Sequence, residues 1–388
     1  MRKPRIGIDA SAIVIARKNG YENYATRLLL SMASLEEAEF DSLDIHLYIY
    51  SGNRLADASL LRTYLPRLQR FPCRVFRPRR GFRVALPLWA MRDRLDWLHL
   101  PVHLWSQRLP VPVLSTFHDA CSRRWLASGG EAYTEITQLE HLTSRQIAMS
   151  DAFIAVSAST KRDLIELLGV TSDRVHVVLH GADGSFVETP DRSDAIRAHY
   201  GLTSYILSVN ALQGNKNYGR LIRAFGEMTR SGRTDRVLAI VGRDGWGAAS
   251  IHTQIESAGV DLPVRYLGYV PQVDLPGLYA GADLVVNASL CEGFGFPILE
   301  ALEAGAVVAA SRSTSLPEVG GNGVAYFDPF DVNDMARVME RALTDTSYRI
   351  ALRDAAQLRL ADLTWEKAAR STLDVYRTIA ARKKGGVS

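Results

Sequence analysis

Short runs of β-branched and aromatic residues alternate with amphipathic segments along the whole chain. This alternation is typical of parallel sheets whose strands are joined by crossover helices. In the first half we expect strands at residues 5–9, 45–50, 73–76, 113–117, 152–156 and 175–179. In the second half we expect them at 205–209, 237–241, 264–267, 284–287 and 306–310. Helices should lie between the strands, notably at 24–32 and 160–168, so the pattern predicts an α/β protein with a Rossmann-like sheet in each half.

The length of the chain favours two domains. Its 388 residues match two units of about 100 to 200 residues each. A polar stretch at residues 187–192, followed by a helix, precedes the first strand of the second half, which places the boundary near Pro190. The chain closes with a helix that Thr364 can cap and that carries Glu366 in its first turn. We therefore expect domains at 1–190 and 191–363, with 364–388 as a terminal helix and tail.

Composition and cysteine content narrow the class of protein. With 47% hydrophobic and 23% charged residues, the chain is neither collagen-like nor disordered. No apolar run approaches the roughly 20 residues of a membrane-spanning helix, and the opening residues leave no room for a signal peptide. Cys73, Cys121 and Cys291 form no C-x2-C pair, so we expect neither a disulfide framework nor a zinc ribbon. The expected location is the reducing cytoplasm.

The sequence contains none of the motifs that Rossmann-like domains commonly use to bind dinucleotides, nucleotides or metal ions. The first strand is not followed by G-x-G-x-x-G, there is no Walker A sequence, and no D-x-D pair is present to hold a divalent ion on a diphosphate. The pairs His99/His103 and His176/His180 lie in strand-like contexts rather than on helices. We therefore expect no bound metal and no resident cofactor.

The densest group of candidate residues is the segment Ser289-Leu-Cys-Glu292-Gly-Phe-Gly295-Phe-Pro297, which follows a predicted strand and opens a predicted helix. Glycine lets a backbone approach a ligand closely, and the amino terminus of a helix favours anions. Glu292 and Glu300 could bind different hydroxyls of one extended ligand. The alternative is a turn followed by an amphipathic surface helix; the embedded glycines and proline favour the binding site.

This segment resembles the signature of glycosyltransferase family 4. Further matches follow in the family's order: Gly20-Tyr21-Glu-Asn-Tyr24, Thr116-Phe-His118-Asp119, Val156-Ser157-Ala-Ser159, Gly181-Ala-Asp183, Lys216-Asn217, Gly268-Tyr-Val-Pro271 and Ser313-Thr-Ser-Leu-Pro317-Glu318. The resemblance implies the GT-B fold, in which two Rossmann-like domains face a central cleft and the C-terminal helix crosses back to the first domain. It also implies retaining, metal-independent transfer from a nucleotide sugar, the co-substrate, to a saccharide acceptor.

The resemblance also implies roles for individual residues. Glu292 would contact the transferred sugar, Glu300 the ribose hydroxyls, and Lys216 the diphosphate, where negative charge grows as the sugar leaves. His118 would lie near the donor sugar from the opposite domain, although a buried structural histidine is the alternative. The remaining donor-binding candidates are Gly293, Phe294, Gly295, Phe296, Asn210, Gly20 and Tyr21.

This sequence departs from the family in one respect. The loop before Lys216, which contains Asn210, lacks the arginine that commonly accompanies this lysine. Either Lys216 and backbone amides suffice, or another cation such as Arg243 replaces it. The Thr-x-His-Asp and Ser-Leu-Pro-Glu segments favour a mannosyltransferase that uses GDP-mannose. A UDP- or dTDP-sugar, or a catalytically silent protein that binds a nucleotide sugar, remain the alternatives.

The net charge of +4 lies entirely in the first half, where residues 1–190 hold 24 basic and 20 acidic side chains. Residues 62–94 hold ten arginines against one acid, or 10 − 1 = +9. Arg79, Arg80, Arg83 and Trp89 could contact an anionic membrane surface or a polyprenyl-diphosphate-linked acceptor, as in polysaccharide and lipopolysaccharide biosynthesis. Alternatively, the arginine stems cover the core. Nucleic acid is not an expected partner, because no recognised module is present.

Overall fold

The chain divides into two compact units in the computed structural model, which describes residues 2–15, 20–51, 56–76, 82–102, 108–182, 184–187 and 190–385. Unit 1 comprises Met1–Ala120, Gln138–Gly181 and Thr364–Ser388, and unit 2 comprises Cys121–Thr137 and Ala182–Leu363. The main division at Gly181 precedes the predicted boundary near Pro190, where helix α7 begins. Residues 121–137 were expected in the first domain, but they pack with unit 2.

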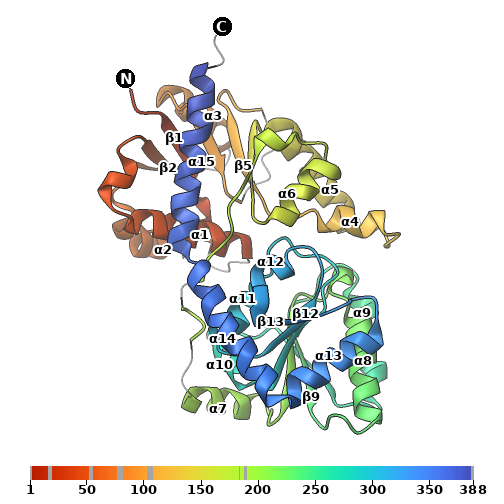
Figure 1. The fold of residues 1–388 in the computed structure, drawn as a ribbon. Helices are drawn as coiled ribbons and strands as arrows, with labels where there is room; N and C mark the ends of the chain where they lie inside the picture. The colour runs from red at the N-terminus through yellow and green to blue at the C-terminus, as the bar shows by residue number, and fades with distance from the viewer. Residues whose placement is uncertain are drawn as a thin grey trace. The chain divides into compact units, whose positions relative to one another are not determined.

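Unit 1 is built on a parallel sheet of seven strands in the order β3-β2-β1-β4-β5-β6-β7 (Figure 1). The strands are β1 (Arg5–Asp9), β2 (Asp44–Tyr50), β3 (Cys73–Phe76), β4 (Trp97–Leu100), β5 (Val113–Phe117), β6 (Ala152–Ala155) and β7 (Val175–Val177). The helices are α1 (Gly20–Ser34), α2 (Ala56–Tyr64), α3 (Phe82–Arg92), α5 (Thr134–Met149), which begins in the 121–137 segment, and α6 (Ala158–Glu166). The central strands are buried along their length, as parallel strands covered on both faces must be.

The C-terminal helix α15 (Trp365–Gly385) belongs to unit 1, although the chain reaches it from unit 2. Thr364 caps it by accepting a hydrogen bond from the Lys367 backbone N–H at 3.2 Å. Its buried face reaches the sheet, where the Tyr376 hydroxyl lies 2.7 Å from Nδ1 of His99 on β4. The helix therefore completes the core of unit 1, as the family resemblance predicts.

Unit 2 contains a parallel sheet of six strands in the order β10-β9-β8-β11-β12-β13. The strands are β8 (Tyr205–Val209), β9 (Val237–Val241), β10 (Val264–Gly268), β11 (Leu284–Asn287), β12 (Val308–Ser311) and β13 (Val324–Phe327). The helices are α4 (Cys121–Ala127), α7 (Pro190–His199), α8 (Tyr218–Arg230), α9 (Ala248–Gly259), α10 (Leu275–Gly281), α11 (Phe296–Glu303), α12 (Leu316–Gly320), α13 (Val332–Thr344) and α14 (Thr346–Asp362). Two Rossmann-like domains are thus present, which confirms the predicted fold class.

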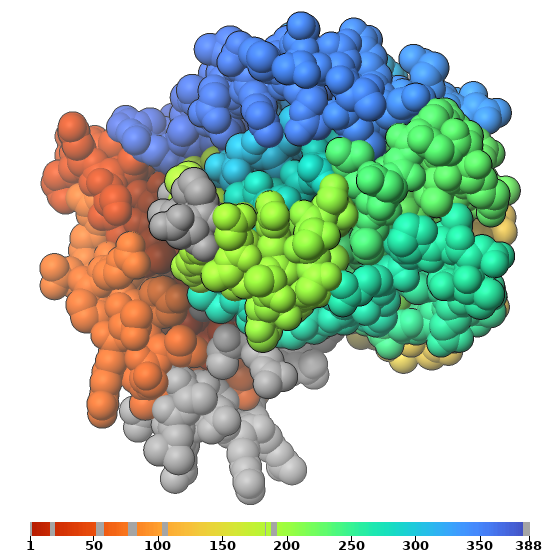
Figure 2. All heavy atoms as spheres, turned by 90° about the horizontal axis from the view of Figure 1, so that it is seen from below, coloured from red at the N-terminus to blue at the C-terminus, as the bar shows by residue number. Residues whose placement is uncertain are grey.

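Helix α7 shows how small residues allow close packing at the surface of unit 2. Figure 2 shows it in lime green beside teal segments of the same unit. It lies on α10, where a Cβ added to Gly277 would come within 3.0 Å of the Ile196 side chain. The Ser193 hydroxyl also donates a hydrogen bond to the Gly277 carbonyl at 3.0 Å. The predicted linker thus ends in a helix that is firmly part of unit 2.

Candidate active site

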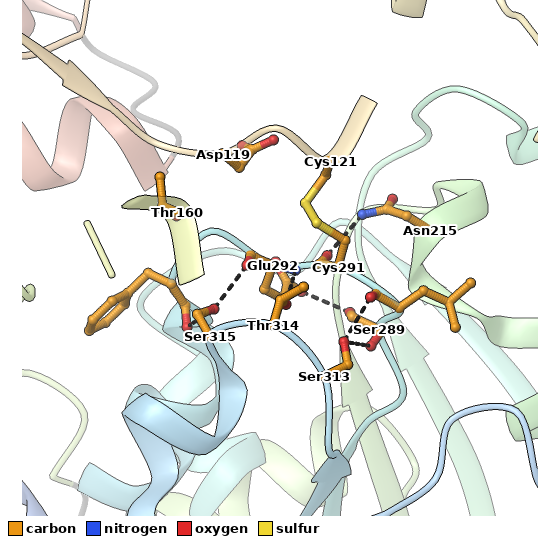
Figure 3. Close-up of a disulfide and its surroundings, with 12 residues drawn as sticks. Asp119, Cys121, Thr160, Asn215, Ser289, Cys291, Glu292, Ser313, Thr314 and Ser315 are labelled. Atoms are coloured by element: carbon orange, nitrogen blue, oxygen red, sulfur yellow. Dashed lines mark hydrogen bonds between the residues drawn. A yellow bond between two sulfur atoms is a disulfide. The ribbon is translucent and has the colours of Figure 1, made fainter. Parts of the chain in front are cut away.

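The loop between β11 and α11 carries Glu292, and neighbouring loops hold it in place (Figure 3). The Glu292 backbone N–H donates to Thr314 Oγ1 at 2.9 Å, and the Ser315 hydroxyl donates to the Glu292 carbonyl at 2.9 Å. Both partners lie in the loop after β12. At the start of the Glu292 loop, Asn287 Oδ1 accepts from the Ser289 N–H at 3.1 Å. The backbone on both sides of the Glu292 carboxylate is therefore fixed before any ligand binds.

Gly295 and Pro297 shape this loop, and Pro297 lies in the first helical turn as the sequence predicts. Gly295 has a φ of +104°, and a Cβ there would lie 2.7 Å from the Leu316 side chain. Only glycine fits such a position without strain. Helix α11 then begins at Phe296 with Pro297 in its first turn. The first N–H groups of the helix, together with Gly293 and Phe294 before it, stand at the positive end of the helix dipole, which favours an anionic ligand.

Lys216 lies at the end of a short 3-10 turn between β8 and α8, and it meets Glu292 directly. Its Nζ is 2.7 Å from Glu292 Oε1, and the two side chains are only 10% and 13% exposed. The Ser289 hydroxyl donates to the same carboxylate oxygen at 2.8 Å. The structure therefore joins two residues, predicted separately for the diphosphate and the sugar, in one largely buried ion pair.

Asn215 links the turn that carries Lys216 to the loop that carries Glu292. Its side-chain Nδ2 donates to the Cys291 backbone carbonyl at 3.1 Å, while the backbone carbonyl of Asn215 accepts from the Leu290 N–H at 2.8 Å. The side chain is 4% exposed. Our sequence analysis missed this residue, and its position directly before Lys216 was the only signal available.

A disulfide bond connects Cys121 to Cys291, with a Cα–Cα distance of 5.5 Å (Figure 3). The expectation that these cysteines do not pair is therefore wrong. They are 170 residues apart in sequence, and the packing of residues 121–137 on unit 2 brings them together. The bond ends at the residue immediately before Glu292, so it belongs to the structural surroundings of the candidate site.

Asn210 and Arg243 each have contacts of their own in unit 2. The Asn210 carbonyl accepts a hydrogen bond from the Tyr218 hydroxyl at 2.9 Å, and its N–H donates to the Val241 carbonyl. Arg243 is exposed, and its guanidinium carbon lies 4.1 Å from the centre of the Tyr269 ring. The cation beside Glu292 in the structure is Lys216.

Glu300 lies one turn into α11 and accepts a hydrogen bond from the Tyr279 hydroxyl at 3.0 Å. Tyr279 is fully buried on α10. Burial, reinforced by the negative charge of Glu300, holds the pKa of Tyr279 well above its usual value. The hydroxyl therefore keeps its proton and orients the carboxylate, which can accept further hydrogen bonds as binding of a sugar diol requires.

In unit 1, His118 follows β5 and lies among aromatic rings. Its Nε2 is 2.8 Å from the Pro101 carbonyl, which can only accept, so Nε2 carries the proton. Burial is the main cause that lowers the pKa of His118; a neutral ring then has a lone pair on Nδ1. The Tyr21 ring stacks on the imidazole at 4.4 Å, and its hydroxyl donates to Asp119 at 2.7 Å. Gly20, the first residue of α1, is exposed beside Tyr21.

The basic stretch is only partly described by the structure. Arg79 and Arg80 lie outside the described residues, as does the side chain of Arg83. Trp89 is half-buried between the guanidinium groups of Arg74 and Arg92, whose central carbons lie 4.1 Å and 4.6 Å from its ring centre. Two cation–π contacts therefore hold the Trp89 ring.

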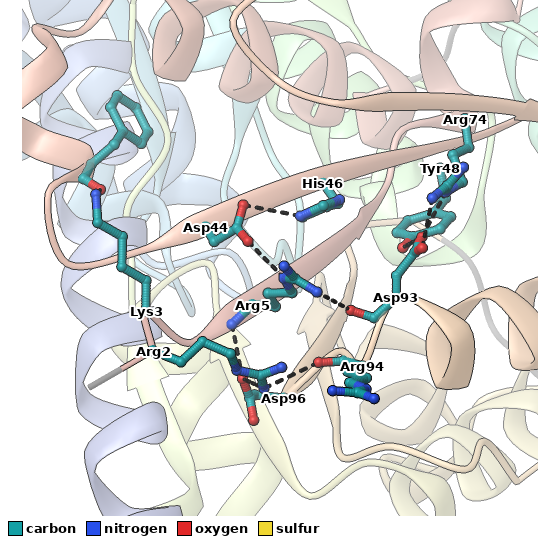
Figure 4. Close-up of polar contacts among 11 residues, drawn as sticks. Arg2, Lys3, Arg5, Asp44, His46, Tyr48, Arg74, Asp93, Arg94 and Asp96 are labelled. Carbon is teal, nitrogen blue, oxygen red and sulfur yellow. Dashed lines mark hydrogen bonds and ion pairs between the residues drawn. The ribbon is translucent and has the colours of Figure 1, made fainter.

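Arg74 itself has a structural role. It makes two 2.6 Å hydrogen bonds to the buried Asp93, which also accepts from the Tyr48 hydroxyl (Figure 4). The arginine hydrogen bonds and that from Tyr48 keep the pKa of Asp93 low against the effect of burial, which raises it. For Arg74 these contacts favour the alternative interpretation, in which an arginine stem covers the core.

Helix α3 exposes an apolar face that the sequence analysis did not identify. Val84, Leu88 and Met91 are 62%, 55% and 51% exposed, and their spacing of four and three residues places them on one side of the helix. Leu86 and Ala90, on the opposite side, are completely buried. A surface helix that is apolar on both sides is unusual and indicates a contact surface. None of the helices that the structure describes is both long and apolar enough to span a membrane.

The chain is similar to known glycosyltransferases over most of its length. Residues 19–186 match the family described as "Glycosyltransferase Family 4", and residues 176–359 match "Glycosyl transferases group 1". The O-antigen chain mannosyltransferase B of Escherichia coli is 29% identical over 75% of this chain and 77% of that protein. The serotype-specific mannosyltransferase WbdA of Escherichia coli is 33% identical over 58% of this chain, but over only 29% of its own length.

The fold has counterparts among solved structures. HepE from Anabaena, crystallised with UDP and glucose, aligns with 97% of this chain and all of its own, at a TM-score of 0.66 and 18% identity. At this identity the likeness concerns the fold alone.

Proposed function

Because this chain belongs to the glycosyltransferases of family 4, we propose that it transfers mannose from GDP-mannose to a saccharide acceptor, with retention of configuration and without a metal ion. The buried pairing of Lys216 with Glu292 carries the proposal, since it sets a cation and a sugar-binding carboxylate side by side. The similarity to two mannosyltransferases, one of them an O-antigen chain enzyme, supports the choice of sugar and a place in cell-surface polysaccharide synthesis.

Charge stabilisation is the main task of this site. When the bond between the sugar C1 and the diphosphate oxygen breaks, its electron pair stays on the oxygen. Lys216 and the positive end of α11 stabilise that charge, as a divalent ion does in other enzymes. The acceptor hydroxyl attacks C1 from the same face, and its proton passes to the departing phosphate oxygen. This route needs no protein nucleophile.

The other residues orient the donor. Glu292 binds hydroxyls of the transferred sugar, and Glu300, fixed by Tyr279, binds the ribose. Both carboxylates are suited to this because an ionised carboxylate only accepts hydrogen bonds, and sugar hydroxyls can donate them. We keep His118 of unit 1 as a catalytic candidate on the strength of the resemblance, with Nδ1 as its acceptor.

The acceptor in this proposal is lipid-linked, at the inner face of the cytoplasmic membrane. The apolar face of α3, formed by Val84, Leu88 and Met91, supports peripheral contact with a membrane, because three exposed apolar side chains in one row can enter the boundary between headgroups and acyl chains. Arg92 adjoins this row and attracts anionic lipids. In this proposal Val84, Leu88 and Met91 make the apolar contact that the sequence analysis expected of Trp89.

A panel of nucleotides and nucleotide sugars tests the donor. We expect GDP and GDP-mannose to raise the melting temperature, with the size of the shift increasing with ligand concentration as linkage requires. GDP release from GDP-mannose should then depend on added saccharide acceptor. If UDP or dTDP alone stabilised the protein, the donor would be one of the alternative nucleotide sugars and not GDP-mannose. Binding without turnover on any acceptor would instead favour the catalytically silent alternative.

A further inference from the structure

The segment 121–133, which comprises α4 and the residues before α5, lies on unit 2, and two features help to hold it there. The first is the Cys121–Cys291 disulfide. The second is a cluster of aromatic rings, in which Trp125 and Tyr133 lie 5.0 Å and 5.8 Å from Trp246 between ring centres. The disulfide is the only covalent link between this segment and the Glu292 loop among the described residues.

This segment covers the edge of the sheet where a nucleotide sugar would enter. Trp246 lies in the loop after β9, Gly214 in the turn after β8, and Cys291 in the loop after β11, and these three strands are neighbours. Ligands of open α/β sheets bind at the carboxyl ends of the strands, where these loops lie. A Cβ on Gly214 would lie 2.6 Å from the Trp246 ring and 2.8 Å from the Trp125 ring, so the segment packs directly on the turn that carries Lys216.

We propose that Cys121 and Cys291 form a reversible redox modification site that clamps the segment 121–133 over the donor-binding edge. A dithiol reductant attacks the sulfur–sulfur bond and gives up two electrons and two protons as it forms its own disulfide. Both cysteines accept these and become thiols. Oxidation by a disulfide of the same class reverses the step. In the reducing compartment that the sequence predicts, protein disulfides are usually transient.

The expected consequence concerns access to the site. With the bond intact, the segment cannot leave the Glu292 loop, and nucleotide entry and release are slow. After reduction the covalent link is lost and the aromatic contacts remain, so the segment opens more often. Both cysteines are largely buried, at 8% and 4% exposed, so attack by the dithiol itself requires partial opening. Cys73, the third cysteine, is exposed on β3 and unpaired.

Hydrogen exchange of the full-length protein tests the clamp without reference to any substrate. We compare oxidised protein with protein reduced by dithiothreitol, after peptide mapping without reductant to locate the Cys121–Cys291 bond. Reduction should accelerate exchange in residues 121–133 by about tenfold, because local opening governs exchange. Cys121→Ser should exchange like the reduced protein whether or not oxidant is added, and Cys73→Ser should behave like wild type in both states.

Two results would overturn the clamp. One is the absence of the bond from protein treated with oxidised glutathione; the other is equal exchange of residues 121–133 in the oxidised and reduced protein. Because wild-type protein alone gives both measurements, a Cys121→Ser variant that fails to fold does not weaken the test.

Nucleotide kinetics test the second half of the proposal, which rests on the proposed function. Fluorescent GDP should dissociate about fivefold faster from reduced than from oxidised protein, since an opened segment no longer covers the edge. Equal dissociation rates would overturn control of access. Absence of GDP binding in both states, together with the expected change in hydrogen exchange, would contradict the proposed donor and leave the clamp supported.

Discussion

The ammonium group of Lys216 and the carboxylate of Glu292 form an ion pair at 2.7 Å in which both side chains are nearly nine-tenths buried. Replacing either residue by alanine should lower kcat by about 10²- to 10³-fold, because the leaving diphosphate loses its cation or the sugar loses its anchor. The measurement is turnover at saturating donor. Glu256→Gln, at an exposed position on α9, is the control and should keep wild-type turnover.

The same pair makes a prediction about stability. Each single variant leaves one charge without its partner, which costs about 1–3 kcal/mol for a pair that retains some solvent contact and the Ser289 hydrogen bond. The double variant should therefore be less destabilised than the sum of the two. Urea unfolding of all four proteins measures this coupling. Strict additivity would show that the two charges do not stabilise each other.

The buried histidines of unit 1 should make its stability depend on pH. Burial lowers the pKa of His99 to about 3 and that of His180 well below its usual value. The pKa of histidine in the unfolded chain is about 6.5. Below this pH the unfolded chain binds protons that the folded chain does not. Stability is therefore complete above this pH and is lost as pH falls, by about 1.4 kcal/mol per pH unit for each such histidine.

Denaturant unfolding between pH 5 and 8 measures this slope. His99→Gln keeps a side chain that can bond Thr116 and Tyr376 but removes one titrating group, so its slope below about pH 6 should be shallower by about 1.4 kcal/mol per pH unit. His141→Gln, which replaces an exposed imidazole on α5, is the matched control. An unchanged slope in His99→Gln would mean that His99 protonates as readily in the folded protein as in the unfolded chain.

Tyr279→Phe tests whether Glu300 binds the donor. The substitution removes only the hydroxyl that orients the carboxylate. A hydrogen bond of this kind is worth about 1 kcal/mol, so KM for the donor should rise about fivefold while kcat changes little. Tyr348→Phe on α14 is the control. A fall in kcat without a change in KM would place Glu300 in the chemical step instead of in donor binding.

The local pattern of apolar and polar residues was sufficient to predict much of the fold and the motif around Glu292. It was insufficient where residues far apart in sequence meet. Strands β1, β5, β8 and β9 lie where the alternation of apolar runs predicts them. Strand β4 was absent from the expected strands, although His99 was placed in a strand-like context. That histidine is buried only because Thr116 and Tyr376, the latter 277 residues away, bond its two ring nitrogens.

Strand β13 was missed as well; it has only four residues and follows a glycine-rich turn. The motif around Glu292 follows from glycine, proline and helix-terminus chemistry, whereas its partners do not. The ion pair with Lys216, the bracing by Asn215 and the bond between Cys121 and Cys291 each join loops far apart in sequence. A single sequence contains no local signal for such contacts.

The disulfide should contribute to global stability as well as to the clamp. It closes a loop across a separation of 170 residues, for which the chain-entropy model gives about 5 kcal/mol. Reduction, or Cys121→Ser, should lower the free energy of unfolding by up to about that amount, measured by urea unfolding with and without dithiothreitol. Cys73→Ser should show the same dependence on dithiothreitol as wild type. Equal stability of oxidised and reduced protein would show that the bond does not constrain the unfolded chain.

The apolar face of α3 predicts binding to anionic membranes that is separable from catalysis. Wild-type protein should sediment with vesicles containing phosphatidylglycerol at low salt and much less with phosphatidylcholine alone. Leu88→Glu or Met91→Glu should weaken binding by about tenfold, since each places a charge where about 1.5–3 kcal/mol of apolar burial is expected. Leu358→Glu is the matched control, because Leu358 is 75% exposed on α14 in the other unit.

Turnover with a water-soluble saccharide acceptor should be unchanged in Leu88→Glu, because α3 contributes none of the donor-binding residues. Loss of vesicle binding with retained turnover would then assign α3 to delivery of a lipid-linked acceptor. Equal vesicle binding by Leu88→Glu and wild type, or an equal loss in Leu358→Glu, would exclude this face as the membrane contact. In that case the arginines of the basic stretch would have to bind the membrane surface by charge alone. Vesicle binding would then disappear as salt is added, because at 0.1 M ionic strength charges are screened over about 10 Å.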